Sequence, residues 1–173
     1  EASCYDSKSD FQRCIEVYKE LLKDKKDIND VLLGTIYNNM AIVMLKNKNY
    51  KESEAFFDRA YMLRYEQAPE TISHVIIESA AFYYETGDMD KFHSKIALGI
   101  ELCRQHNDYG YLIEGLMQLE KAYASSGETD KLRKVYLELL EISEKHSLRQ
   151  SIISSLNKLI GLEIRSKNFA EAY

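Results

Sequence analysis

The sequence predicts an all-α protein built as a solenoid of antiparallel helix hairpins. Three observations predict this fold class. A short motif recurs about every 40 residues, apolar residues inside each copy are spaced three and four apart, and the 173 residues include only 1 proline and 7 glycines. Helical spacing together with few turn-forming residues indicates long helices joined by short turns.

The recurring motif is a short polar turn followed by an anchor residue that opens an apolar stripe. Successive anchors are separated by 39, 39, 40 and 40 residues. Such a fixed period is the sequence mark of stacked structural repeats. The five anchors are Phe11, Tyr50, Met89, Thr129 and Phe169.

Each anchor is predicted to begin a trailing helix, and a leading helix is predicted before it. After Tyr50, for example, Ser53, Phe57 and Ala60 fall on one helical face. This spacing is typical of a helix with one buried side. The leading helices are marked by the apolar spans 36–45, 75–84, 112–124 and 152–164.

Start and stop signals agree with these helices. Asn29 or Asp30 and Asn107 or Asp108 are suited to cap leading helices, whereas Asn49, Asp88 and Thr129 are suited to cap trailing ones. Pro69 fits a first helical turn, where the missing N–H costs little. Gly87 and Gly127 lie at hairpin joints, where a left-handed residue often ends a helix.

The repeats predict the domain organisation. We expect one solenoid domain over residues 1–173, with complete hairpins at 28–67, 68–106 and 107–147. Partial repeats at 1–27 and 148–173 flank them, the first holding Ala2 and Tyr5 and the second starting a new helix at Phe169. Solenoids normally finish with polar capping elements, and neither end of this sequence resembles one. We therefore expect this chain to be part of a longer one.

The hairpins resemble the tetratricopeptide repeat family. The resemblance covers essentially the whole chain and rests on the alternation of large, small and aromatic residues. The first complete copy reads Tyr37, Met40, Ala41 and Met44, then Tyr50, Ser53, Phe57 and Ala60. In the third copy Glu120 replaces a small residue, and we expect looser packing there. The resemblance implies a right-handed superhelical solenoid whose first helices line a concave groove.

The repeat of about 40 residues is longer than the roughly 34 residues of the standard unit. Extended units of this kind are similar to those of bacterial regulators, such as peptide-pheromone receptors and sensor segments attached to signalling or DNA-binding domains. The resemblance thus implies a bacterial signalling or transcription-regulating protein that binds a peptide or protein.

The helical period places a set of polar and apolar side chains on the expected groove. Amides suit peptide binding because each offers a donor and an acceptor to a backbone. An ordinary solvated face remains the alternative for any one of them. The candidate peptide-binding residues are Asn38, Ile42, Lys46, His74, Glu78, Tyr84, Met117, Gln118, Lys121, Asn157, Lys158 and Arg165.

Charge and cysteine content limit the classes of function. With 28 acidic and 23 basic residues the net charge is −5, and without a basic face we expect no nucleic-acid contact by this segment. No apolar run approaches the roughly 20 residues that span a bilayer, so we expect no membrane association. Three cysteines without metal-ligand spacing favour reduced thiols and a cytoplasmic location.

Residues that carry chemistry are scattered. The four histidines, His74, His93, His106 and His146, fall on different predicted helices without metal-ligand spacing. Cys14 and Cys103 fall on apolar stripes, as inert core cysteines do. We therefore expect no enzyme activity, no metal and no cofactor.

Three functional hypotheses remain open from the sequence, the third being an enzyme accessory domain with no ligand of its own. The first is a sensory or regulatory module that binds a peptide or protein in the groove and biases an attached output domain. The second is an assembly scaffold, in which the ends or the convex face mediate homo-oligomer or complex formation.

Overall fold

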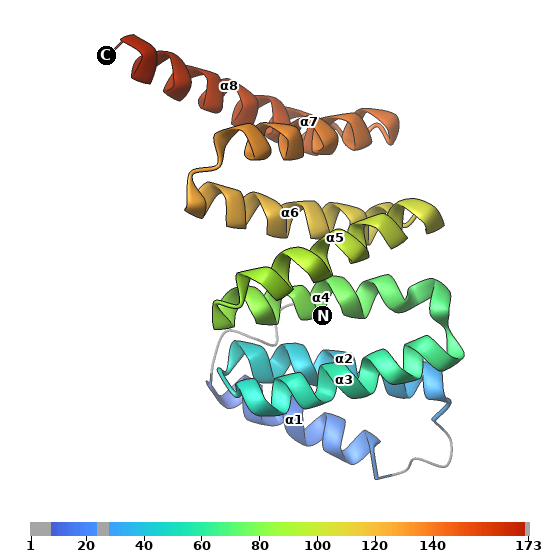
Figure 1. Cartoon of the computed structure of the whole chain (residues 1–173). Coiled ribbons are helices and arrows are strands. Elements are labelled where there is room, and N and C mark those ends of the chain that lie inside the picture. The colour runs from blue at the N-terminus through green and yellow to red at the C-terminus, as the bar shows by residue number, and fades with distance from the viewer. Residues whose placement is uncertain (1–7, 24–27, 172–173) are drawn as a thin grey trace. The chain divides into compact units, whose positions relative to one another are not determined.

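The computed structural model describes residues 8–23 and 28–171, and in this part of the chain the regular elements are eight α-helices and one short 3-10 turn, with no strand. The all-α prediction is confirmed. The helices are α1 (Lys8–Leu21), α2 (Asp30–Lys46), α3 (Tyr50–Gln67), α4 (Ile72–Thr86), α5 (Met89–His106), α6 (Tyr109–Ser126), α7 (Thr129–Lys145) and α8 (Arg149–Glu171), with the turn at Pro69–Thr71 before α4 (Figure 1).

Three of the predicted anchors are the first residues of trailing helices, since Tyr50, Met89 and Thr129 begin α3, α5 and α7. The chain divides into two compact units, Glu1–Leu102 and Cys103–Tyr173. The single superhelical domain over 1–173 stays a prediction.

The first unit is built on the α2–α3 hairpin, whose helices lie side by side (Figure 1). Small residues allow the close approach: Ala41 and Ser53 are fully buried, and the Ser53 hydroxyl donates to the Ala41 carbonyl at 2.8 Å. At the α4–α5 packing, a Cβ added to Gly99 would lie 2.5 Å from Cγ1 of Ile77. The small positions of the repeat therefore set the spacing between helices.

The second unit holds the end of α5 and the helices α6, α7 and α8, with α7 in contact with both α6 and α8. Its core is formed by aliphatic side chains of the three helices, including Leu116, Leu139 and Leu162. The Arg104 guanidinium at the end of α5 pairs with Glu138 of α7 at 2.7 Å. This packing positions one face of α8 opposite the end of α6.

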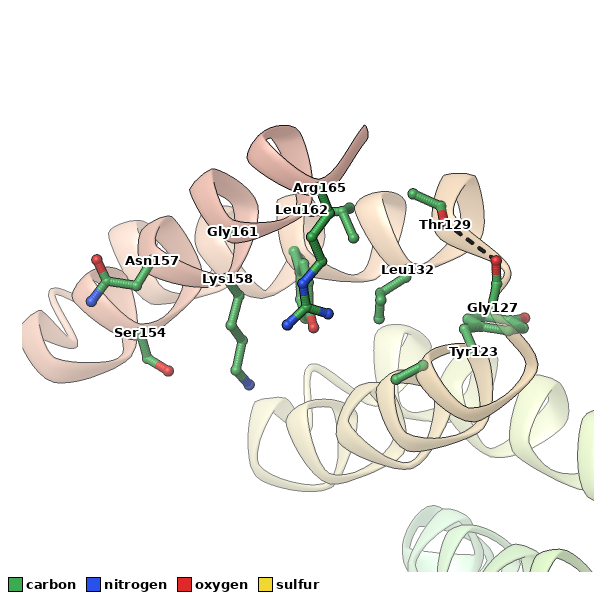
Figure 2. Close-up of a pocket in the computed structure, with 12 residues that line it drawn as sticks. Tyr123, Gly127, Thr129, Leu132, Ser154, Asn157, Lys158, Gly161, Leu162 and Arg165 are labelled. Carbon is green, nitrogen blue, oxygen red and sulfur yellow. Dashed lines mark hydrogen bonds between the residues drawn. The ribbon is translucent and has the colours of Figure 1, made fainter. Parts of the chain in front are cut away.

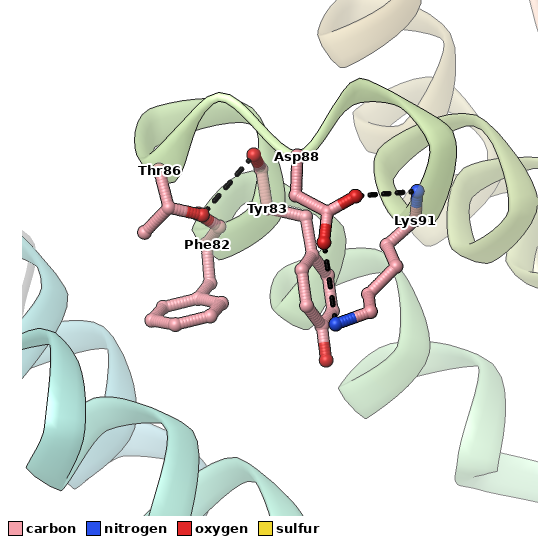
Figure 3. A network of polar contacts seen from close by, with 5 residues as sticks. All are labelled: Phe82, Tyr83, Thr86, Asp88 and Lys91. Carbon is pink, nitrogen blue, oxygen red and sulfur yellow. Dashed lines mark hydrogen bonds and ion pairs between the residues drawn. The ribbon is translucent and has the colours of Figure 1, made fainter.

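Hairpin joints use left-handed residues and a recurring ion pair. Gly87 has φ 82° and ends α4. The Asp88 carboxylate then accepts the backbone N–H of Lys91 at 3.1 Å and pairs with its ammonium at 3.2 Å (Figure 3). That ammonium lies 5.2 Å from the centroid of the Tyr83 ring. Forty residues later the α6–α7 joint repeats the left-handed glycine, the ion pair and the cation–π contact with Gly127, Glu128–Lys131 and Tyr123, but the Glu128 side chain makes no cap bond to α7.

The cap predictions are confirmed in part. The side chains of Asn29, Asp88 and Asp108 accept backbone N–H groups of the first turn of the helices that they precede. Asn49 makes no such bond, because its amide lies against the sulfur of Met44 at 3.7 Å. Thr129 is already the first residue of α7, and its hydroxyl donates to the Gly127 carbonyl.

The helix starts predicted at Phe11 and Phe169 are wrong. The helix α8 continues through Phe169 to Glu171, so no new helix opens there. Lys48 turns the chain with φ 62° in the similar Lys-Asn-aromatic motif, but no residue of α8 has a positive φ. Continuing the helix avoids the cost of a left-handed lysine. At the other end α1 begins at Lys8, three residues before Phe11, whereas Ala2, Tyr5 and Cys4 lie outside the described residues.

Candidate functional site

A cavity of about 800 Å³ lies in the second unit between the end of α6, the start of α7 and the face of α8 that looks toward them. We call it the α8 pocket. Figure 2 shows the side chains of Lys158 and Arg165 extending from α8 into this space, with Tyr123 and Leu132 on the other side. The pocket is lined by Tyr123, Ala124, Gly127, Thr129, Leu132, Tyr136, Ser154, Asn157, Lys158, Gly161, Leu162 and Arg165.

A polar network forms one side of the pocket and joins all three helices of the unit. The Lys158 ammonium pairs with the Glu120 carboxylate, at 2.7 Å from Oε1 and 2.8 Å from Oε2. The Tyr136 hydroxyl donates to the same carboxylate at 3.3 Å. Lys158 also lies 5.5 Å from the centroid of the Tyr136 ring, within cation–π range. Glu120, where the sequence predicts looser packing, links α8 to α6 and α7 through these polar contacts.

The tyrosine of this network has a perturbed pKa. Burial raises the pKa of the Tyr136 hydroxyl, and the negative charge of Glu120 and its hydrogen bond raise it further. The positive charge of Arg165 opposes the rise in this pKa. Tyr136 is therefore a neutral hydrogen-bond donor at neutral pH, with the guanidinium of Arg165 in its vicinity.

Three predicted groove residues of α8, Asn157, Lys158 and Arg165, come together in the α8 pocket. Met117 of α6 is half exposed and lines a smaller cavity of about 270 Å³, which Lys158 also borders. Gln118 is half-buried on α6, and Lys121 is exposed. Part of the predicted set thus lines one cavity, whereas Gln118 and Lys121 lie outside the lining of that cavity.

In the first unit the structure brings two predicted residues together. The Asn38 amide of α2 donates to the Glu78 carboxylate of α4, and Asn38 is only 7% exposed. Ile42 packs against the core, and the Tyr84 ring meets Phe92 edge to face at 5.4 Å. His74 is half-buried and Lys46 is exposed at the end of α2. In the first unit the predicted face therefore holds one polar contact between helices, from Asn38 to Glu78, and the side chains of Ile42 and Tyr84, which pack against their neighbours.

Sequence reasoning missed the aromatic and aliphatic side of the pocket. Tyr123 and Tyr136 are not among the groove residues that the helical period predicts. In the structure they pack and also line the cavity. Leu132, which is 7% exposed, likewise lines the pocket. Their positions were the signal that could have found them. Tyr123 and Leu132 lie within about one helical turn of the α6–α7 joint, and Tyr136 faces Glu120.

The described residues contain no group of three histidine, cysteine or acidic side chains placed to hold a metal ion. None of the described helices combines the length and apolar character needed to cross a membrane.

Comparison with known proteins gives the class of fold of this chain. No protein-family model matches the sequence, and no curated protein matches it. A solved structure, described as the crystal structure of BtubC (BKLC) from P. vanneervenii, is similar with a TM-score of 0.69 and 15% sequence identity. The similarity covers 94% of this chain and 74% of that one. At this identity the comparison shows a shared helical fold and nothing of function.

Proposed function

We propose that this chain is a non-catalytic binding module with a right-handed tetratricopeptide-like superhelix. It holds a peptide or a segment of a partner protein in the α8 pocket and along the polar faces of the leading helices. In this proposal it is the sensory or regulatory segment of a bacterial signalling or transcription-regulating protein. It acts in the cytoplasm and contacts neither nucleic acid nor membrane.

The α8 pocket is the observation that carries this proposal. Its volume of about 800 Å³ lies within the range of about 300–1,000 Å³ that is usual for ligand sites. Its lining combines aromatic and aliphatic surface with the amide of Asn157 and the cations of Lys158 and Arg165. Such a mixture can bury an apolar side chain while the amide bonds to a peptide backbone.

Secondary observations support the other parts of the proposal. The helix–turn–helix period of about 40 residues continues from α2 to α8, which supports the repeat architecture. Cys14 is half-buried and Cys103 is buried, so both suit inert core cysteines.

A peptide selection tests the proposal. Peptides from a random library are selected on the immobilised chain, and the affinity of the best one is measured for the parent, for Asn157→Ala and for Lys134→Ala. Lys134 is exposed on α7 and does not line the pocket. We expect Asn157→Ala to weaken binding about threefold to tenfold, as the loss of one hydrogen bond does, and Lys134→Ala to leave it unchanged. Equal affinities of all three chains would move the binding surface elsewhere.

A second candidate function, the assembly scaffold, is favoured by one apolar surface. Ile153, Leu156, Ile160 and Ile164 form a stripe on α8, each between 42% and 56% exposed. Leu116, forty residues before Leu156, is only 1% exposed, in the helix that α7 covers. The equivalent of Leu156 in α6 is thus buried, and the exposed α8 stripe can accept an amphipathic helix of a partner.

The scaffold function is tested by the oligomeric state. If the α8 stripe joins two copies, Ile160→Glu converts a dimer into a monomer in sedimentation equilibrium, whereas Leu137→Glu on α7 does not. Leu137 is 50% exposed and provides a matched surface position in the same unit. A parent chain that is monomeric at every concentration would exclude assembly of this kind.

A further inference from the structure

The lining of the α8 pocket has a charge opposite to that of the whole chain. Among its twelve residues are two cations, Lys158 and Arg165, and no acidic side chain. The chain as a whole carries a net charge of −5. A local excess of positive charge on an acidic protein favours the approach of an anionic ligand group.

The two cations of the pocket have different environments. The charge of Lys158 is compensated by Glu120, whose two oxygens lie 2.7 and 2.8 Å from its ammonium. Among the described side chains none forms an ion pair with Arg165, and the nearby Glu163 pairs with Arg133 of α7. The guanidinium of Arg165 is therefore available to a ligand. Lys158 mainly holds α8 against Glu120 of α6.

The surroundings of Arg165 favour recognition of a carboxylate. A guanidinium binds a carboxylate through two parallel hydrogen bonds, and this geometry is stronger and more directional than a point charge. The Tyr136 hydroxyl, which donates its proton to Glu120, lies close enough to Arg165 for the guanidinium charge to lower its pKa. Leu132 and Leu162 add apolar walls beside this polar corner.

We propose that the α8 pocket recognises a peptide segment through a glutamate or aspartate side chain that binds Arg165. Beside that carboxylate, the Asn157 amide bonds to the peptide backbone and the apolar walls cover a neighbouring side chain. The inference rests on the proposed peptide-binding function and specifies its ligand class. A peptide is favoured over a small free acid because the lining extends from Arg165 to Asn157 and Ser154 along α8, several residues from the cation.

The test uses defined probes and a matched arginine. Hexaglutamate with blocked ends is titrated into the isotope-labelled 173-residue chain, and backbone amide shifts are followed by NMR. Hexaglutamine with blocked ends and the small dicarboxylate glutarate are the comparison probes. Arg165→Gln removes the proposed contact, whereas Arg133→Gln removes an arginine that is also exposed and lies outside the lining.

We expect hexaglutamate to shift amides that line the pocket, including those of Gly127 and Gly161, and to bind more tightly than hexaglutamine or glutarate. Arg165→Gln should weaken hexaglutamate about tenfold, and Arg133→Gln less than about twofold. Equal binding of hexaglutamate and hexaglutamine at these amides would overturn the carboxylate preference and leave the peptide function standing. Equal binding of glutarate would overturn the peptide as the ligand class. If no probe shifts these amides, the pocket fails as a binding site and the proposed function loses its support.

Discussion

Replacing Lys158 by methionine tests how strongly the Glu120–Lys158 pair holds α8 in place. The ammonium lies 2.7 Å from one carboxylate oxygen, and the side chains of Lys158 and Glu120 are 37% and 19% exposed. Fully exposed pairs contribute about 0.2–1 kcal/mol, and breaking a buried pair costs about 3–5 kcal/mol. This pair is intermediate, so we expect Lys158→Met to lower the free energy of unfolding by about 1–2 kcal/mol.

The expected loss has a specific cause. Lys158→Met leaves a largely buried carboxylate whose neighbouring donor is the Tyr136 hydroxyl at 3.3 Å. The double variant Glu120→Leu with Lys158→Met removes both charges, and we expect its stability to lie within about 0.5 kcal/mol of the parent. The size of the effect thus depends on whether one partner or both are replaced.

Urea denaturation followed by circular dichroism measures these free energies in a double-mutant cycle. The exposed pair between Arg133 and Glu163, with side chains 47% and 44% exposed, is the matched control and should show a coupling of at most about 0.5 kcal/mol. A Glu120–Lys158 coupling below about 0.3 kcal/mol would show that the two effects are additive and would refute the anchoring role.

Two further predictions concern helix packing and pH. Gly99→Ala should destabilise the chain by about 1–3 kcal/mol, because the added Cβ would meet Ile77. Gly161→Ala has open space around it and should be neutral or stabilise the chain by up to about 1 kcal/mol. Urea midpoints of the two variants that shift in the same direction would contradict this prediction. Burial raises the pKa values of Tyr83 and Tyr136 above the ordinary 10.0, so their contribution to stability is complete below pH 10.0 and is lost as pH rises through the higher folded values. Unfolding free energies measured between about pH 9 and 11 should fall less steeply in Tyr83→Phe with Tyr136→Phe than in the parent, and equal slopes would refute this assignment.

Much of the fold follows from local patterns in the sequence. The anchors Tyr50, Met89 and Thr129 mark helix starts because turn chemistry and apolar spacing agree at each of them. The same pattern fails at Phe169, where no left-handed residue interrupts α8. A short motif is therefore sufficient only where the backbone geometry of the joint accompanies it.

The candidate site was less predictable than the fold. Helical spacing identified Asn157, Lys158 and Arg165, which share one face of α8. It could not show that Tyr136 both packs and lines the cavity, or that Glu120 reaches Lys158 across a separation of 38 residues. Such contacts depend on how helices pack in three dimensions and not on the period of any one helix.

The location of a bound peptide tests the central claim most directly. A photoreactive benzoylphenylalanine replaces Tyr123 in the α8 pocket, Ile160 on the α8 stripe or Tyr65 on α3, and each chain is irradiated with the selected peptide. Ile160 and Tyr65 are 56% and 62% exposed, so all three positions are accessible to a ligand. We predict a covalent adduct from position 123 and none from position 65 or 160. Adducts from position 160 or 65, with none from 123, would contradict peptide binding in the pocket.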